Sequence, residues 1–323
     1  METFKRKIWE KFKAWKEESD GHTALLVEGA RRIGKSTAVE EFAKKEYETY
    51  ILIDFAFASQ NIKNLFNDLS DLDHFFRMLQ YYTGKELIER KSLIIFDEVQ
   101  LFPLARQAIK LLVKDHRYDY METGSLLSIK ENVKDILIPS EERAIQMYPM
   151  DYEEFCWAIG QTNSFELGRT IWQEKKSLGD DINRDLMKKF RLYMIVGGMP
   201  QSIEAFIKTN NFSKVDLVKR DILKLYENDF MKFDSSGRSS LIFDHIPAEL
   251  QKNASRYQIS SVIENARAGT MLERVAKLQD SKTVNIAYHA NAPEAGLSQN
   301  IDLEKFKLFI CDTGLFVTLC FKD

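Results

Sequence analysis

A glycine-rich segment near the N-terminus has the residue types and spacing needed to hold phosphate groups. Residues 29–36 read Gly-Ala-Arg-Arg-Ile-Gly-Lys-Ser, which fits G-x-x-x-x-G-K-[S/T] at every fixed position. The glycines let the backbone curl so that successive N–H groups point at phosphate oxygens. Lys35 adds a mobile charge for the β- and γ-phosphates, and the Ser36 hydroxyl is a ligand for Mg²⁺. The segment therefore predicts a site for a nucleoside triphosphate with magnesium.

The elements expected on either side of this segment suit that chemistry. An apolar strand is predicted at residues 24–28 and a helix at residues 35–47, whose positive end faces the phosphates. A glycine turn with a fortuitous lysine is the alternative, but it would require neither element. The residues expected to contact the nucleotide are those of the loop and its exit: Gly29, Ala30, Arg31, Arg32, Ile33, Gly34, Lys35, Ser36 and Thr37.

Two carboxylates, Asp97 and Glu98, follow the apolar run at residues 92–96. Asp97 is expected to hold magnesium through water, opposite Ser36, and Glu98 to polarise the attacking water as a general base. An acidic residue after a buried strand can also merely cap the next element. The Asn-Lys-x-Asp string that GTPases use for guanine is missing, since the nearest string, at residues 213–216, is Ser-Lys-Val-Asp. The pair therefore favours ATP hydrolysis.

Further polar side chains are candidates for contact with the γ-phosphate or the water. Thr123 and Ser125 close a predicted strand, although a simple helix N-cap explains them equally well. Arg143, just before the fifth predicted strand, is the first choice for an arginine that stabilises charge in the transition state. Arg31 and Arg32 lie inside the loop and instead could point outward to a partner.

Strands and helices alternate in the first half of the chain, which indicates βαβ units and a parallel sheet. The predicted fold class is α/β: a P-loop NTPase parallel sheet of the additional-strand type, with the fourth strand between the first and the third. A helical lid and a winged-helix-like α+β segment are expected to follow. The predicted domains are residues 1–150, 151–236 and 237–323, with a linker at residues 234–240. The predicted strands of the sheet are residues 24–28, 50–54, 92–96, 119–123 and 144–148.

Composition limits the remaining function classes. The net charge is −3, and a protein that mainly grips nucleic acid usually shows a basic excess. No apolar run is long enough to span a bilayer, and no secretory signal opens the chain. The three cysteines have no metal-ligand spacing and are expected to be buried free thiols, which indicates the cytoplasm.

Taken together, the motifs resemble the prokaryotic AAA-type ATPases that carry a conserved C-terminal domain of unknown function. The resemblance covers nearly the whole chain, and its strings begin at Trp15, Gly29, Phe96, Thr123, Tyr148, Val196 and Lys307. It implies an additional-strand sheet, a helical lid, a winged-helix segment and usually a restriction-endonuclease-like portion. The chain stops at Asp323, where that portion would begin, so either a truncated form or a member that lost this portion is expected. No Asp…Glu-x-Lys nuclease pattern is visible in the C-terminal part of the chain, so nuclease activity is not predicted. Many members of the family that the chain resembles have glycine where Glu142 stands here. This departure weakens the assignment of Arg143 as the arginine that reaches the γ-phosphate.

Three functions remain open at this stage. The first is an ATPase whose nucleotide state switches contacts with a macromolecular partner. That partner is a protein or a second copy of the chain, or a nucleic acid, which the charge does not support. The second is an ATP-dependent DNA-binding regulator that uses the winged helix, although residues 241–323 hold nine Lys and Arg against ten Asp and Glu. The third, a P-loop kinase for a small metabolite, lacks the paired arginines of a mobile lid.

Overall fold

The computed structural model describes residues 3–124, 139–162, 164–252, 254–264, 266, 268–292 and 296–322. The chain falls into two units, of which the first is Arg6–Met147. The second unit is Tyr148–Asp323 together with Met1–Lys5.

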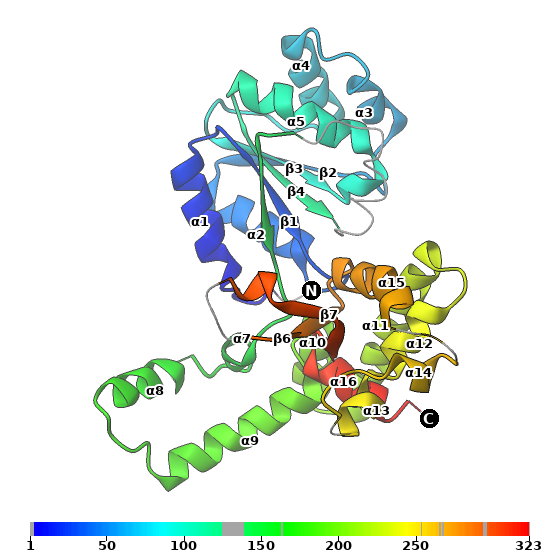
Figure 1. The fold of residues 1–323 in the computed structure, drawn as a ribbon. Helices are drawn as coiled ribbons and strands as arrows, with labels where there is room; N and C mark the ends of the chain where they lie inside the picture. The colour runs from blue at the N-terminus through cyan, green and yellow to red at the C-terminus, as the bar shows by residue number, and fades with distance from the viewer. Residues whose placement is uncertain are drawn as a thin grey trace. The chain divides into compact units, whose positions relative to one another are not determined.

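A five-stranded sheet in the order β2-β3-β4-β1-β5 forms the centre of the first unit (Figure 1). Each pair of neighbouring strands is parallel, which confirms the predicted P-loop type of sheet, with β4 between β1 and β3. Helices cover both faces, so β1 and β3 are buried and read as nearly continuous apolar runs. The strands are β1 Ala24–Glu28, β2 Thr49–Asp54, β3 Ser92–Asp97, β4 Asp119–Gly124 and β5 Glu142–Gln146.

Two sets of helices cover the two faces of this sheet (Figure 1). On one face, α3, α4 and α5 share a large aromatic and aliphatic cluster with the strands, while α1 and α2 lie on the other face. The first helix begins at Ile8, and Phe4 packs against the core of the second unit. The helices are α1 Ile8–Ser19, α2 Lys35–Glu46, α3 Gln60–Leu65, α4 Leu72–Thr83, the 3₁₀ helix η1 Val99–Leu101 and α5 Pro103–Asp115.

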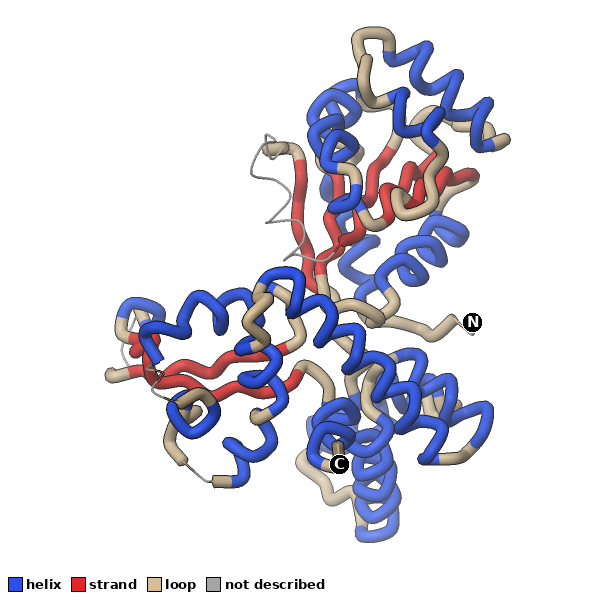
Figure 2. The backbone as a smooth tube through the Cα atoms, turned by 90° about the vertical axis from the view of Figure 1, so that its right-hand side faces the viewer, coloured by secondary structure: helices blue, strands red, loops and turns tan. Residues whose placement is uncertain are grey.

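The second unit is mainly helical in its described part, with an antiparallel ribbon of β6 and β7 (Figure 2). Helices α13, α14 and α15 precede that ribbon in the predicted order, and their identification as a winged helix stays a prediction. The sequence patterns do not predict α8, α12 or α16. The elements are α7 Tyr152–Ala158, α8 Ser164–Gln173, α9 Asp180–Val196, α10 Pro200–Thr209, α11 Phe212–Phe233, α12 Arg238–Asp244, α13 Ile246–Gln251, α14 Ile259–Val262, α15 Ala268–Asp280, β6 Val284–Ala290, η2 Leu297–Gln299, β7 Ile301–Ile310 and α16 Thr313–Cys320.

The segment predicted as a linker joins α11 to α12 within this second unit. Asp234 is buried there and accepts hydrogen bonds from the backbone N–H and the hydroxyl of Ser239, both at 2.8 Å. Its carboxylate also pairs with Arg274 on α15, at 3.1 Å. The connection is therefore tied to the helices around it.

A turn after α9 organises the centre of the second unit. Asp312, the N-cap of α16, is buried and accepts hydrogen bonds from the N–H groups of Gly198 at 2.5 Å and Leu315 at 2.9 Å. Gly197 has a φ of +83°, and a β-carbon on it would lie 2.4 Å from a carboxylate oxygen of Asp312. A β-carbon on Gly198 would lie 1.9 Å from the carbonyl oxygen of Met150. The turn therefore requires two glycines in succession.

The replacement Gly198→Ala tests this close packing. Since the added methyl would meet rigid backbone, we expect the free energy of unfolding to fall by about 1–3 kcal/mol. The matched control is Gly168→Ala in α8, where a β-carbon meets nothing within 4 Å; helix propensity should there raise stability by about 0.5–1 kcal/mol. Urea unfolding followed by circular dichroism measures both, and a Gly198→Ala protein as stable as wild type would contradict the packing.

Candidate functional site

The glycine-rich segment forms the turn between β1 and α2. Gly34 has a φ of +88° and is the N-cap of α2, so the helix dipole begins at the end of the loop. Gly29 has a φ of +158°, and a β-carbon on it would lie 2.5 Å from both the carbonyl oxygen of Met147 and a side-chain carbon of Ile33. The two glycines therefore allow a narrow loop that turns sharply into the helix, as phosphate binding requires.

The ammonium group of Lys35 lies inside this loop. It donates hydrogen bonds to the carbonyl oxygens of Gly29 at 3.0 Å and Ala30 at 2.9 Å, and the residue is only 8% exposed. Burial lowers the pKa of Lys35 to about 8, although the charges of Glu98 and Asp97 act in the opposite direction. The loop thus holds one poorly solvated cation next to two carboxylates, an arrangement that an added anion would stabilise.

Two hydroxyl groups converge on the carboxylate of Asp97 at the end of β3. The Ser36 hydroxyl donates to Oδ1 at 2.7 Å, and the Thr123 hydroxyl donates to the same oxygen. Ser36 comes from the first turn of α2 and Thr123 from β4, so three elements meet here because their strands run parallel. A hydroxyl and a carboxylate at hydrogen-bond distance are suitable ligands for Mg²⁺, which takes few protein ligands when phosphate oxygens and water complete its shell.

Glu98 follows Asp97 in a left-handed backbone conformation, with a φ of +53°. Its N–H donates to the Thr123 hydroxyl oxygen at 3.4 Å, and its carboxylate accepts a hydrogen bond from the side-chain amide of Gln100. This conformation is uncommon for a residue with a side chain and occurs often at functional sites. Through its hydrogen bond, Gln100 positions the Glu98 carboxylate, which the sequence predicts to be the general base.

The structure brings most of the predicted site residues to one edge of the sheet. The loop Gly29–Ser36, with the adjoining Thr37, lies there with Asp97, Glu98 and Thr123, because β1, β3 and β4 all end at that edge. The side chains of Arg31 and Arg32 are exposed on the loop. Ser125 lies outside the described residues.

Arg143 is not brought to this edge within the chain. It lies opposite Leu25 near the start of β5, whereas the phosphate loop begins after Glu28, three strand positions further on. Its guanidinium pairs with the exposed carboxylate of Glu18 on α1, at 2.8 Å. Strand positions are about 3.3 Å apart, so Arg143 lies about 10 Å along the strand from the position of Glu28, and the loop begins one residue beyond Glu28. Its role as an arginine that reaches the γ-phosphate stays a prediction.

A buried cluster of charged residues below the site is not predicted from the sequence. Arg106 on α5 forms a two-pronged ion pair with Glu142 on β5, at 2.7 and 2.8 Å. Glu122, next to Thr123 on β4, is fully buried nearby, and its pKa is raised well above the usual range by burial and by Glu142. Glu142, just before Arg143, is thus the partner of a buried arginine.

Two contacts around the loop are also missed by sequence patterns. Arg6, which is buried, donates to the carbonyl oxygen of Ile33 at 2.9 Å across 27 positions of sequence. Gln100, two residues after Glu98, has no role predicted from the sequence. Neither contact follows from a period or a spacing pattern that could reveal it.

Comparisons with known proteins agree with this geometry. Residues 21–156 match the AAA domain family AAA_14, and residues 187–322 match DUF8612, a domain of unknown function. No curated protein matches the chain.

Solved structures add a likeness of fold. The Walker-type ATPase paby2304 of Pyrococcus abyssi is 14% identical, with a TM-score of 0.52 over 98% of this chain and 96% of its own. The RuvB Holliday junction branch migration motor of Thermotoga maritima is 10% identical, with a TM-score of 0.37 over 87% of this chain and 89% of its own. The first likeness concerns the fold alone, and the second is too weak to bear on either fold or function. The chain thus has an AAA-type P-loop domain at residues 21–156, followed by a DUF8612 domain at residues 187–322.

Proposed function

We propose that this protein binds ATP with magnesium and hydrolyses it, and that the nucleotide state changes its contacts with a partner protein. The observation that supports hydrolysis is the meeting of Ser36, Asp97 and Thr123 next to Glu98, whose N–H donates to the Thr123 hydroxyl. This set combines a magnesium site with a general base, whereas binding alone would not need Glu98. The AAA domain match supports the same chemistry.

Each residue has a separate task in this proposal. Lys35 exchanges its two carbonyl partners for the β- and γ-phosphate oxygens, while the loop N–H groups hold the remaining oxygens. Ser36 and Asp97 hold magnesium, which neutralises charge that develops on the phosphates. Glu98 accepts a proton from the attacking water, and Thr123 orients that water or the γ-phosphate. Gln100 positions the Glu98 carboxylate.

The alternative, a DNA-binding regulator, receives less support from the predicted winged helix. On α15, Arg274 pairs with Asp234 and Lys277 pairs with Glu273 at 3.1 Å, so both cations are already neutralised. A recognition helix needs free cations to approach phosphates. A protein partner is therefore the better proposal.

Among all the residues that the structure describes, no helix is both long enough and apolar enough to cross a membrane. The cysteines are free thiols; Cys156 is buried, whereas Cys311 and Cys320 are partly exposed. A cytoplasmic location stays a prediction.

The replacement Glu98→Gln tests hydrolysis. An amide keeps the size of the side chain but loses its basicity, so we expect kcat to fall by about 10²–10⁴-fold while the affinity for Mg-ATP stays within about threefold. The matched control is Glu86→Gln, an exposed glutamate outside the site. Phosphate release and nucleotide titration measure the two effects, and equal turnover in the Glu98→Gln and control proteins would refute the assignment.

The low pKa of Lys35, about 8, predicts proton uptake on nucleotide binding. Phosphates favour the charged lysine and raise its pKa in the complex, so below pH 7 little uptake is expected from this residue. At pH 8 about half a proton should be taken up, and above that the affinity should fall by up to about tenfold per pH unit. Calorimetry in buffers of different ionisation enthalpy measures the protons, with Lys35→Arg as the control that stays charged. The same proton uptake in the wild-type and Lys35→Arg proteins would contradict Lys35 as the group that takes up the proton.

The salt dependence of DNA binding tests the alternative of a DNA-binding regulator. We expect no binding of duplex DNA at about 150 mM salt and no stimulation of ATP turnover by DNA, because the cations of α15 are paired. A mobility-shift series from low to high salt measures this. Specific binding with a steep loss of affinity as salt rises would favour the regulator over the protein-partner proposal.

A further inference from the structure

Helices α8 and α9 form a hairpin that extends from the rest of the second unit (Figure 1). α9 spans 17 residues, of which Val196, at its last position, is the fully buried one. Helices in compact units usually bury an apolar stripe. Because most residues of α9 are exposed, its exposed apolar residues are available to bind a partner.

One side of α9 carries an apolar ridge. Met187, Phe190 and Met194 are spaced three and four positions apart and therefore lie on one face of the helix. They are 42%, 37% and 41% exposed. Three large apolar side chains that remain in contact with water would gain free energy if a partner covered them.

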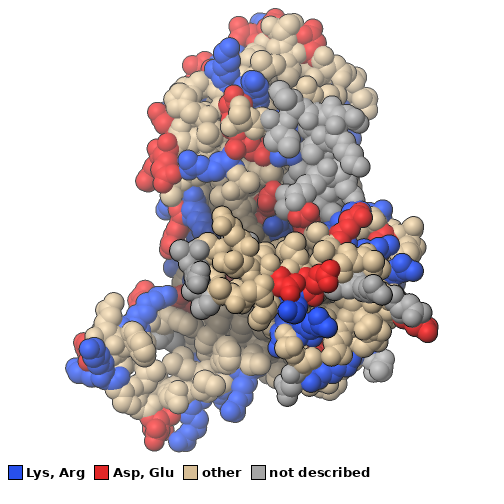
Figure 3. All heavy atoms as spheres, in the orientation of Figure 1, with Lys and Arg blue, Asp and Glu red and all other residues tan. Residues whose placement is uncertain are grey.

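A basic ridge runs beside this apolar one. Arg184, Lys188 and Arg191 are also spaced four and three positions apart, and all three are exposed. Met187 lies three residues after Arg184 and four before Arg191, so the two ridges are neighbours on the helix surface. None of the three cations has an ion pair within the described residues. The hairpin, at the lower left of Figure 1, shows Lys and Arg together with some Asp and Glu among uncharged atoms in Figure 3.

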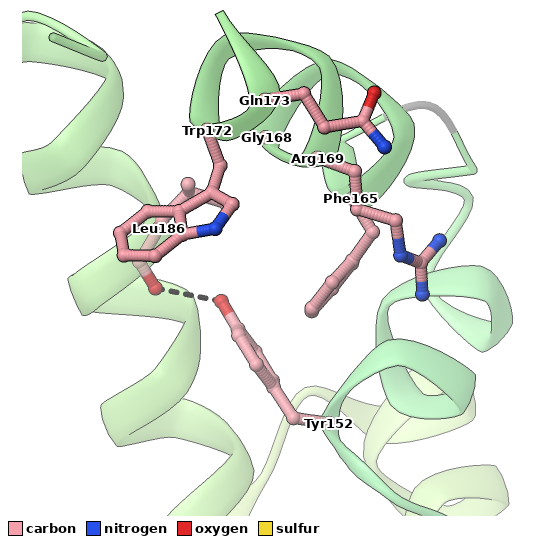
Figure 4. A pocket seen from close by; sticks show the side chains of 7 residues that line it. All are labelled: Tyr152, Phe165, Gly168, Arg169, Trp172, Gln173 and Leu186. Carbon is pink, nitrogen blue, oxygen red and sulfur yellow. Dashed lines mark hydrogen bonds between the residues drawn. The ribbon is translucent and has the colours of Figure 1, made fainter. Parts of the chain in front are cut away.

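An apolar pocket adjoins the ridges where α7, α8 and α9 meet. Its volume is about 360 Å³, enough for one large side chain, and its walls include Phe165, Trp172 and Leu186 (Figure 4). Tyr152 closes it from α7 and donates a hydrogen bond to the Leu186 carbonyl oxygen at 2.7 Å. Trp172 at its edge is 83% exposed. Isolated exposed tryptophans of this kind are typical anchors of protein interfaces.

We propose that the hairpin is the docking face for an amphipathic helix of a partner protein. That helix would lay its apolar stripe on Met187, Phe190 and Met194, insert one large apolar side chain into the pocket, and place acidic residues beside the basic ridge. A helix in a groove binds through apolar anchors at this spacing, and flanking charges set its orientation.

The mixed charges of the hairpin favour a protein over other polyanions. Residues 164–196 hold seven Lys and Arg and five Asp and Glu. DNA or an anionic membrane would meet these acidic residues as well as the basic ridge, and neither would fill an apolar pocket lined by aromatic rings. An amphipathic helix with acidic flanks matches the apolar ridge, the basic ridge and the pocket.

The proposal rests on the proposed function only in that it supplies the protein partner of the nucleotide switch. The binding test uses two synthetic amphipathic peptides with the same leucine and phenylalanine stripe, one flanked by glutamates and the other by lysines. Fluorescence anisotropy of the labelled peptides is measured with the full chain and without nucleotide. We expect the acidic peptide to bind at least about tenfold more tightly than the basic one.

Two sets of variants locate the binding. Met187→Ser with Met194→Ser should weaken the acidic peptide by at least about tenfold, and charge reversal of Arg184, Lys188 and Arg191 to Glu should invert the preference. The matched controls are Leu217→Ser on α11, which is 61% exposed, and Lys175→Glu in the loop after α8. ATP turnover should stay unchanged in all of these proteins, which shows that they fold.

Equal affinity for the two peptides, or binding that the methionine changes leave intact, would overturn the proposal. Tighter binding of duplex DNA or phosphatidylserine vesicles through the basic ridge would also overturn it, in favour of a phosphate-bearing surface. Because the binding test needs no nucleotide, its failure would leave the hydrolysis test standing, and the reverse also holds.

Discussion

The candidate site depends on one interaction, the meeting of two hydroxyl groups at the Asp97 carboxylate. Ser36 follows β1, Asp97 ends β3, and Thr123 lies at the end of β4, so only a parallel sheet brings all three to one edge. The backbone carbonyl of Asp97 also accepts a hydrogen bond from Phe55 beyond β2, at 3.1 Å. A shift of β3 by one residue would turn the carboxylate to the opposite face of the sheet, so the register of the strands determines the chemistry.

The phosphate loop keeps its shape through contacts of its own. Lys35 is bound to two loop carbonyls and Arg6 to a third, so these three acceptors have hydrogen-bond partners. The burial of Lys35 is unfavourable for a charged group, as its lowered pKa indicates, and a triphosphate removes that cost. The loop is therefore preorganised for an anion, and part of the free energy of binding comes from relief of a poorly solvated charge.

The sequence predicts the parts of the fold and site that have a local signature. Buried parallel strands read as apolar runs, and the glycines, Lys35, Ser36 and the Asp97–Glu98 pair follow from phosphate chemistry. Gln100 and Arg6 act through contacts that follow no spacing rule. Arg143 pairs with Glu18, because its position along β5, and not its residue type, determines whether it can reach the phosphate loop. Helix α16 escapes prediction because its residues Leu-Phe-Val-Thr-Leu resemble a strand, although its N-cap at Asp312 is a helix signal.

Both connections between the two units leave the first unit beside the phosphate loop. Met147 donates to the Glu28 carbonyl oxygen at 2.8 Å and crowds Gly29, and Arg6 binds the loop at Ile33. Three residues after Met147, the N–H of Met150 is bound to Gly198 at 2.8 Å in the second unit. Only Tyr148 and Pro149 lie between these anchors; proline fixes its own φ and restricts the residue before it. Under the proposed switch, a change in loop shape on nucleotide binding would act directly on these short, stiff connections.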